Sequence, residues 1–129
     1  MIKVSNCQEN IYFFLKFIII TGMGIVYLLC ELSDNERYKI GVTRRDVDKR
    51  IKELSTGNSH EIHLVNKFES EHYKKVESWL HRRFGSYKTN EGGTEWFDLP
   101  AEDVIAFTRI CEEVEGTIKY MMEHNHFFK

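Results

Sequence analysis

Gly24-Ile25-Val26-Tyr27, followed after a polar turn by Lys39-Ile40-Gly41, is the stretch that decides the fold of this chain of 129 residues. Residues 24–31 form a continuous apolar run with β-branched and aromatic members, and residues 37–42 repeat that character. The residues between the two runs, 33–36, are turn formers. The pattern predicts a β-hairpin that places polar side chains beside glycines, which is the outline of a phosphate-handling site.

Apolar periodicity predicts the other elements. A helix is expected over residues 45–55, with Thr43 as its cap and residues 56–58 as its end. A strand is expected over residues 61–68, with Ile62, Leu64 and Asn66 on one side.

Two further helices are expected over residues 70–84 and 100–123, the second opened by Pro100, with a short extended segment at 95–99 between them. The whole order predicts an α+β fold, in which a small three-stranded mixed or antiparallel sheet is flanked by helices and a C-terminal helix is added.

Charge is unevenly distributed along a chain whose net charge is −2. Residues 44–88 hold eleven Lys or Arg against seven Asp or Glu, whereas residues 101–129 hold three against six. An acidic C-terminal part therefore masks a basic middle that suits a nucleic-acid partner. The three cysteines, Cys7, Cys30 and Cys111, are far apart and form no Cys-x-x-Cys pair, which favours reduced thiols in a cytoplasmic protein.

The N-terminal residues need separate treatment because residues 11–20 are strongly apolar apart from Lys16. Ten residues are too few to span a bilayer, so membrane association is disfavoured. Three interpretations stay open: an extra element on the core, a membrane anchor, or an upstream extension of a protein that begins at Met23. We expect residues 1–22 to be an apolar extension, 23–100 a single domain, and 101–129 a helix packed on that domain.

Glu77 stands out because it lies inside the apolar stripe that Tyr73, Leu80 and Phe84 form on the predicted helix 70–84. A buried carboxylate without a partner would be strongly destabilising, so it must meet a cation, a hydrogen-bond donor or a metal ion. His81 follows Glu77 at helical i, i+4 spacing, but no second pair of ligands supports a zinc site. His81 is expected to line the edge of the site. A structural ion pair and a metal ligand remain the two interpretations of Glu77.

Val47, Ile51 and Leu54 form the apolar face of the predicted helix 45–55. Arg50 lies at the margin of this face, in a run that also contains Arg44 and Arg45. Such a run is often only a solvated surface. An arginine at the boundary between core and solvent can also be held rigidly with its guanidinium facing a phosphate. Tyr27 has the same ambiguity, since an aromatic residue in a strand is most often part of the core.

These pieces resemble the GIY-YIG nuclease superfamily, in particular the small phage-type branch in which the second motif reads Lys-Ile-Gly. The resemblance covers residues 24–100 and rests on the order and spacing of its motifs, which are Gly24-Ile25-Val26-Tyr27, Tyr38-Lys39-Ile40-Gly41, Arg50 with Leu54, Glu77 with Leu80-His81 and Phe84, and Glu95-Trp96-Phe97.

The resemblance implies hydrolysis of DNA phosphodiester bonds with one divalent cation, Mg²⁺ or another such as Mn²⁺. By this similarity Tyr27 takes a proton from the attacking water, Arg50 holds the scissile phosphate and Glu77 binds the ion. We expect Arg44, Arg45 and His81 to contact nucleic acid. Oxygen ligation suits a hard cation, and a fixed arginine suits a transition state that gains negative charge.

One departure from the family concerns the second motif, where Lys39 occupies the position of a tyrosine. A free phenol titrates at about pH 10, so a tyrosine base needs cations nearby. Lys39 is our candidate for one of them. The alternative function is a non-catalytic nucleic-acid-binding module of the same fold, and a third is a protein-interaction or membrane-associated module that uses residues 1–22. Whether a homodimer or a recognition partner supplies specificity is left open, as is the pathway.

Overall fold

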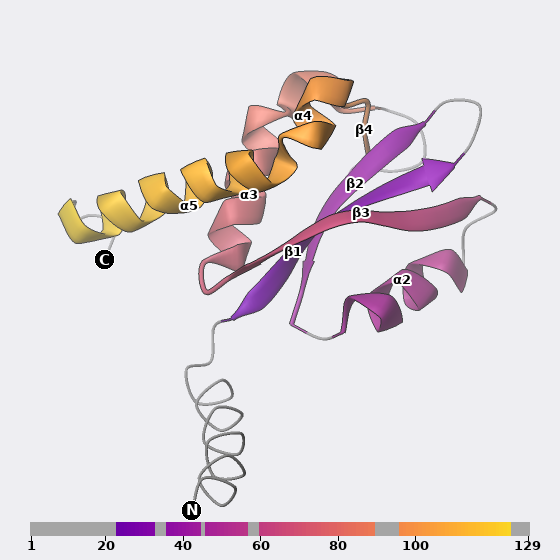
Figure 1. The fold of residues 1–129 in the computed structure, drawn as a ribbon, viewed down its shortest axis with the longest axis horizontal. Coiled ribbons are helices and arrows are strands. Elements are labelled where there is room, and N and C mark those ends of the chain that lie inside the picture. The colour runs from indigo at the N-terminus through magenta and orange to yellow at the C-terminus, as the bar shows by residue number, and fades with distance from the viewer. Residues whose placement is uncertain (1–22, 33–35, 45, 57–59, 90–95, 125–129) are drawn as a thin grey trace, which may run out of the picture.

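The computed structural model describes residues 23–32, 36–44, 46–56, 60–89 and 96–124 (Figure 1). The expected extension over residues 1–22 lies outside these described residues. No helix within the described part of the chain is long and apolar enough to cross a membrane.

The strands among the described residues form one antiparallel sheet at the centre of the fold. Its strands are β1 (Gly24–Leu32), β2 (Arg37–Thr43), β3 (Glu61–Ser70) and β4 (Trp96–Phe97), in the order β3-β1-β2-β4. The α+β class is confirmed, and so is the hairpin, in which Tyr27 pairs with Gly41. Of the two expected sheet types the antiparallel one is confirmed, since each pair of described strands is antiparallel. The strand count of three was wrong, because the short segment near residue 96 joins the edge of β2 at Tyr38 and Lys39.

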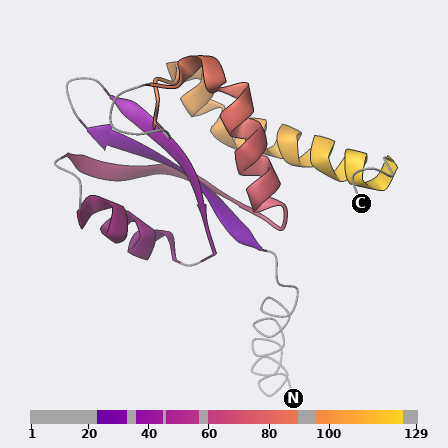
Figure 2. The ribbon, with the colours of Figure 1, turned by 180° about the vertical axis from the view of Figure 1, so that it is seen from behind.

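The sheet separates two layers of helices (Figures 1 and 2). Helix α2 (Val47–Thr56) covers one face, which we call the α2 face. Its core consists of Tyr27, Leu29, Val47, Ile62 and Trp96, with Ile51 and Leu54 packed against them. Helices α3 (Tyr73–Arg83), α4 (Ala101–Ile105) and α5 (Phe107–His124) cover the other face, which we call the α3 face.

Core packing on the α3 face involves β1, β2 and three helices at once. Its fully buried side chains include Val26, Leu28, Ile40, Val76, Leu80, Phe97, Phe107, Ile110 and Ile118. Alternation along β1 explains the division, since Val26 and Leu28 point to the α3 face while Tyr27 and Leu29 point to the α2 face. The residues of α5 therefore belong to the same core as the sheet.

An irregularity in β3 corrects one sequence-based expectation. The register with β1 shifts between Leu28, which pairs with Asn66, and Leu29, which pairs with Leu64. The extra residue, Val65, reverses the alternation, as a β-bulge does. Ile62 consequently faces α2, whereas Asn66 faces the other way and donates a hydrogen bond to Thr108 of α5 at 2.8 Å. Placing Asn66 on the same side as Ile62 was therefore wrong.

Helix boundaries also differ from those expected. Thr43 is the last residue of β2, and the cap of α2 is Asp46, whose carboxylate accepts a hydrogen bond from the Asp48 N–H at 2.9 Å. Ser70 ends β3, and its hydroxyl accepts the His72 N–H at 2.9 Å as the chain turns into α3. The single C-terminal helix is interrupted at Ala106, where ψ is 8°.

Candidate active site

The hydroxyl of Tyr27 and the guanidinium of Arg50 meet on the α2 face of the sheet. Nε of Arg50 donates a hydrogen bond to the Tyr27 hydroxyl at 3.5 Å. The Tyr27 side chain is almost fully buried, with 1% of the residue exposed, and it packs among the apolar residues under α2. The structure thus brings together two of the predicted site residues, which are 23 positions apart in the chain.

Gly41 explains why the tyrosine can occupy this position. It lies opposite Tyr27 in the pairing of β1 with β2. A Cβ atom on Gly41 would overlap the end of the Tyr27 ring, with Cζ only 2.5 Å away. The phenol therefore lies across the space that a side chain at position 41 would fill, and only glycine permits this close approach.

Gly24 has a related role on the α3 face. A Cβ atom there would lie 2.5 Å from Cγ of Tyr73, so the ring of Tyr73 packs directly on the backbone at the start of β1. Tyr73 is the first residue of α3. The glycine of the first motif consequently fixes where α3 begins relative to the sheet.

Arg50 is held by two interactions. Besides the Tyr27 hydroxyl it contacts Glu53, with Nη1 and Oε2 3.1 Å apart. The hydrogen bond to Tyr27 and the one to Glu53 raise the pKa of Arg50, so its positive charge is permanent under all ordinary conditions. Glu53 was not predicted from the sequence, although its i, i+3 spacing from Arg50 on a helix is a recognisable pattern.

Lys39 lies on the same face as Tyr27. It precedes Gly41 by two positions on β2, and residues two apart in a strand share a face. Nζ of Lys39 is 5.7 Å from the centroid of the Trp96 ring. The lysine is half-buried, and its position makes it a diagonal neighbour of Tyr27 in the pairing of the two strands.

A buried ion pair continues this row of polar groups and was not foreseen. Glu31 is 1% exposed and pairs with Arg37 through two contacts, Nε to Oε1 at 3.0 Å and Nη2 to Oε2 at 3.2 Å. The Arg37 guanidinium also lies 4.6 Å from the centroid of the Trp96 ring. The sequence does contain an indication of this ion pair. Glu31 and Arg37 flank the hairpin turn with opposite charges, as cross-strand partners often do.

Glu77 comes from the other layer, on helix α3, and is half-buried. One turn later, Nε2 of His81 is 2.8 Å from the carbonyl oxygen of Ile40, and the ring packs edge-on against Phe97 at a centroid distance of 5.2 Å. Residues four apart on a helix lie on the same side. Glu77 is therefore on the side of α3 that His81 ties to β2.

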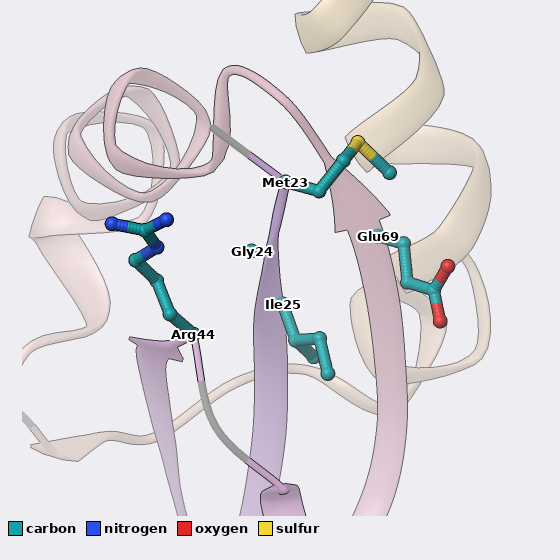
Figure 3. Close-up of a pocket in the computed structure, with 5 residues that line it drawn as sticks. All are labelled: Met23, Gly24, Ile25, Arg44 and Glu69. Carbon is teal, nitrogen blue, oxygen red and sulfur yellow. The ribbon is translucent and has the colours of Figure 1, made fainter. Parts of the chain in front are cut away.

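Of the two arginines predicted to contact nucleic acid at the end of β2, Arg44 and Arg45, the structure describes Arg44. Arg44 is exposed and lines a pocket of about 40 Å³ with Met23, Gly24, Ile25 and Glu69. Figure 3 shows Arg44 and Glu69 on opposite sides of the start of β1. Arg45 lies outside the described residues. The turn residues 33–35 and the helix end at residues 57–58 also lie outside them.

The second tyrosine of the hairpin motif does not share the α2 face. Tyr38 packs against the core of the α3 face. Burial, together with the nearby Cys30 and Glu36, raises the pKa of Tyr38 and keeps it a neutral phenol. Tyr27 is thus the hairpin tyrosine that contacts the arginine of α2.

These features define a class of small α+β proteins in which one face of an antiparallel sheet presents a tyrosine in contact with a helix-borne arginine. The T5orf172 domain matches residues 24–112, so the chain belongs to the T5orf172 domain family. No curated protein and no solved structure was found to match the chain.

Proposed function

We propose that this protein is a divalent-metal-dependent DNA endonuclease of the GIY-YIG type, with Tyr27, Arg50 and Glu77 as its active-site residues. The observation that carries the proposal is the hydrogen bond from Arg50 to the Tyr27 hydroxyl above Gly41. Membership of the T5orf172 family supports it, because this phage-associated domain is commonly linked to GIY-YIG and HNH-type nucleases.

The position of Glu77 along the sheet supports its inclusion. Tyr73 packs on Gly24, which is level with the end of β2, and His81 contacts Ile40. The eight residues of helix from Tyr73 to His81 rise about 12 Å, and the four residues of strand from the end of β2 back to Ile40 span about 13 Å. The two lengths agree, so α3 runs alongside β2 in the opposite direction. Midway along this stretch, Glu77 is level with about Val42.

The phenol of Tyr27 lies at nearly the same level along β2 as Glu77. The Tyr27 ring ends over Gly41, the neighbour of Val42. The described strand β4 pairs with β2 at Tyr38 and Lys39, and α3 reaches the β2 edge farther along, at Ile40. In the proposed site the carboxylate of Glu77 extends past this edge toward the phenol and the guanidinium.

A single carboxylate fits the ion that the function requires. Mg²⁺ in phosphoryl-transfer sites usually keeps several waters and binds one or two protein carboxylates together with substrate phosphate oxygens. Glu77 would hold the ion, and it is the one described residue that we propose as a protein ligand. When bound, the ion supplies neutralisation of charge on the phosphate and its leaving oxygen.

The protein side chains have distinct roles in this proposal. Arg50 presents its guanidinium, whose Nη1 also contacts Glu53, to a non-bridging oxygen of the scissile phosphate and stabilises the charge that develops there. In this proposal Tyr27 takes the proton of the attacking water, and Arg50 donates a hydrogen bond to the same phenolic oxygen, which helps to fix its position. The packing of Tyr27 holds that oxygen in place throughout the reaction.

Cleavage of supercoiled plasmid tests the proposal. The purified protein should nick the plasmid with Mg²⁺ or Mn²⁺ and stop on addition of chelator. Glu77→Gln and Arg50→Lys should each lower the rate at least ~100-fold, whereas Glu112→Gln and Lys119→Arg, exposed positions on α5, should leave it unchanged. Electron paramagnetic resonance of Mn²⁺ should show bound ion in the parent protein and weaker binding in Glu77→Gln.

The alternative, a nucleic-acid-binding module without catalysis, predicts a different result. DNA would shift in a gel in a salt-dependent manner, Glu77→Gln would shift it equally well, and no preparation would nick plasmid. That outcome would replace the nuclease proposal.

A further inference from the structure

Two arginines and a tryptophan line a hollow in the helix layer on the α3 face. Trp79, Arg82 and Arg83 of α3 line an open pocket of about 360 Å³. An adjoining pocket of about 220 Å³ is lined by Trp79 and Arg83 together with Glu113, Val114 and Thr117 of α5. We call the two together the Trp79 groove. It lies between α3 and α5, two helices that pack against each other on the α3 face.

The groove is separate from the candidate active site although both use α3. Trp79 follows Glu77 by two residues, which corresponds to a rotation of about 200° around a helix. Glu77 therefore faces the β2 edge while Trp79 faces α5. Trp79, Arg82 and Arg83 have no role in the proposed active site.

The charge balance of the groove favours an anionic partner. Arg82 is exposed, and its guanidinium lies 5.5 Å from the centroid of the Trp79 ring. Arg83 is about half-exposed and lies 4.0 Å from Glu113, whose other carboxylate oxygen is 2.7 Å from Arg109. Among the described residues that line the groove, Glu113 is the one acid; it is shared between Arg83 and Arg109, so these lining residues carry an excess of positive charge.

We infer that the Trp79 groove binds a single-stranded segment of nucleic acid. A half-buried indole beside two guanidinium groups is the combination that such segments need, since unpaired bases stack on aromatic rings while arginines contact the phosphates. In a duplex both faces of each base are already covered by its neighbours. An acidic peptide would use the arginines and leave the indole unexplained.

The choice of nucleic acid rests in part on the proposed function, but binding at the groove does not require hydrolysis. It can therefore be measured in chelator with the Glu77→Gln variant. Failure of plasmid nicking would overturn the nuclease proposal and leave the binding role of the groove standing. Failure of the binding experiment would overturn the binding role and leave the nuclease proposal standing.

Tryptophan fluorescence gives a local readout because the chain has two tryptophans. Trp96 packs beside Tyr27 and Lys39, so it would report on the active-site face. In a Glu77→Gln, Trp96→Phe background the emission comes from Trp79 alone. Titration with a dye-labelled thymidine oligonucleotide should quench this emission over the same concentration range in which the anisotropy of the dye rises.

Variants of the groove give the expected magnitudes. Arg82→Gln and Arg83→Gln should each weaken binding and reduce the slope of log affinity against log salt by about 0.7, the value for one phosphate contact to a single strand. Trp79→Ala should weaken binding at least ~5-fold. Lys119→Gln, an equal change of charge at an exposed position of α5 that is ion-paired to Glu115, should alter neither quantity.

Three results would overturn the inference. The first is unchanged Trp79 emission at saturating oligonucleotide. The second is equal quenching by a blunt duplex of the same sequence. The third is equal quenching by a polyglutamate peptide of matching charge, which would identify the groove as a site for acidic protein segments.

Discussion

The Tyr27 hydroxyl accepts a hydrogen bond from Nε of Arg50 across 3.5 Å, which links the first strand of the sheet to the helix that covers it. The contact is made possible by a glycine on the neighbouring strand, above which the phenol lies. Strand, helix and glycine must therefore all be in place before the two groups can meet.

Replacing Tyr27 by phenylalanine separates chemistry from packing. The ring remains in the core under α2, so the free energy of unfolding should change by less than ~1 kcal/mol. The hydroxyl is lost, and plasmid nicking should fall by ~100-fold or more. Gel-shift affinity for the same DNA should be retained. A Tyr27→Phe protein that nicks at the parent rate would exclude the phenol from the mechanism.

Gly41→Ala tests the close approach of the phenol. The new methyl group would displace the Tyr27 ring, which should cost about 1–3 kcal/mol in stability and lower the nicking rate. Gly116→Ala is the matched control, because nothing lies within 4 Å of a Cβ atom at that position of α5. It should raise stability by about 0.5–1 kcal/mol. Chemical denaturation of both variants checks these values, and equal effects would contradict the structural account.

Lys39→Met tests whether the lysine assists the phenol. Removing a cation from this face should lower nicking near pH 7 by about 10-fold and move the half-maximal rate to higher pH. Lys39→Arg should behave like the parent protein. The pH dependence of the nicking rate is the measurement, and an unchanged profile for Lys39→Met would remove this side chain from the mechanism.

The Glu31 and Arg37 pair should matter for stability. Arg37→Ala would leave a buried carboxylate without its main partner, and we expect a loss of about 3 kcal/mol. The Glu31→Leu, Arg37→Met double variant should recover most of this loss, because no buried charge remains. Arg109→Ala, which breaks an exposed pair with Glu113, should cost less than ~0.5 kcal/mol. Urea denaturation measures both variants. If Arg37→Ala and Arg109→Ala lost a similar free energy of unfolding, Glu31 could not be a buried carboxylate that depends on Arg37 for its charge partner.

Cys111 should make stability depend on pH in the alkaline range. Burial raises the pKa of its thiol from 9.0 to about 12. The folded protein therefore keeps a proton that the unfolded chain releases above about pH 9, and the free energy of unfolding should fall by up to about 1.4 kcal/mol per pH unit from there until the folded-state pKa is reached. Below about pH 9 this contribution is constant.

The comparison for this prediction is Cys111→Ala, which retains Cys30. Denaturation between pH 8.5 and about pH 10.5 should show a shallower decline in the variant. Identical slopes would mean that the Cys111 thiol is not kept protonated by the fold.

Sequence patterns were sufficient where the relevant contacts are local. The apolar runs at residues 24–31 and 37–42 are close in the chain and end in turn formers, so the hairpin and its glycines could be predicted. The apolar face of α2 was also predicted correctly, since Val47, Ile51 and Leu54 all pack under the sheet. Both predictions needed only the periods of a strand and a helix.

Contacts between distant segments were not predictable in this way. The bulge at Val65 depends on how β3 aligns with β1, and it alone decides that Asn66 faces Thr108. The pairing of Trp96 and Phe97 with β2 depends equally on long-range register. Such register is set by the total packing of both faces of the sheet, which no short stretch of sequence contains.

The amino-acid sequence by itself determined which residues are chemically unusual. These are a tyrosine in a hairpin that contains glycines, an arginine at the edge of the apolar face of one helix, and a glutamate within the apolar face of a second helix. Tertiary structure alone decided that Tyr27 and Arg50 touch and that α3 is tied to β2 through His81, one turn from Glu77. The physical reason is that periodicity specifies the direction of a side chain within its own element, whereas the distance between two elements is set by the packing of the core that joins them.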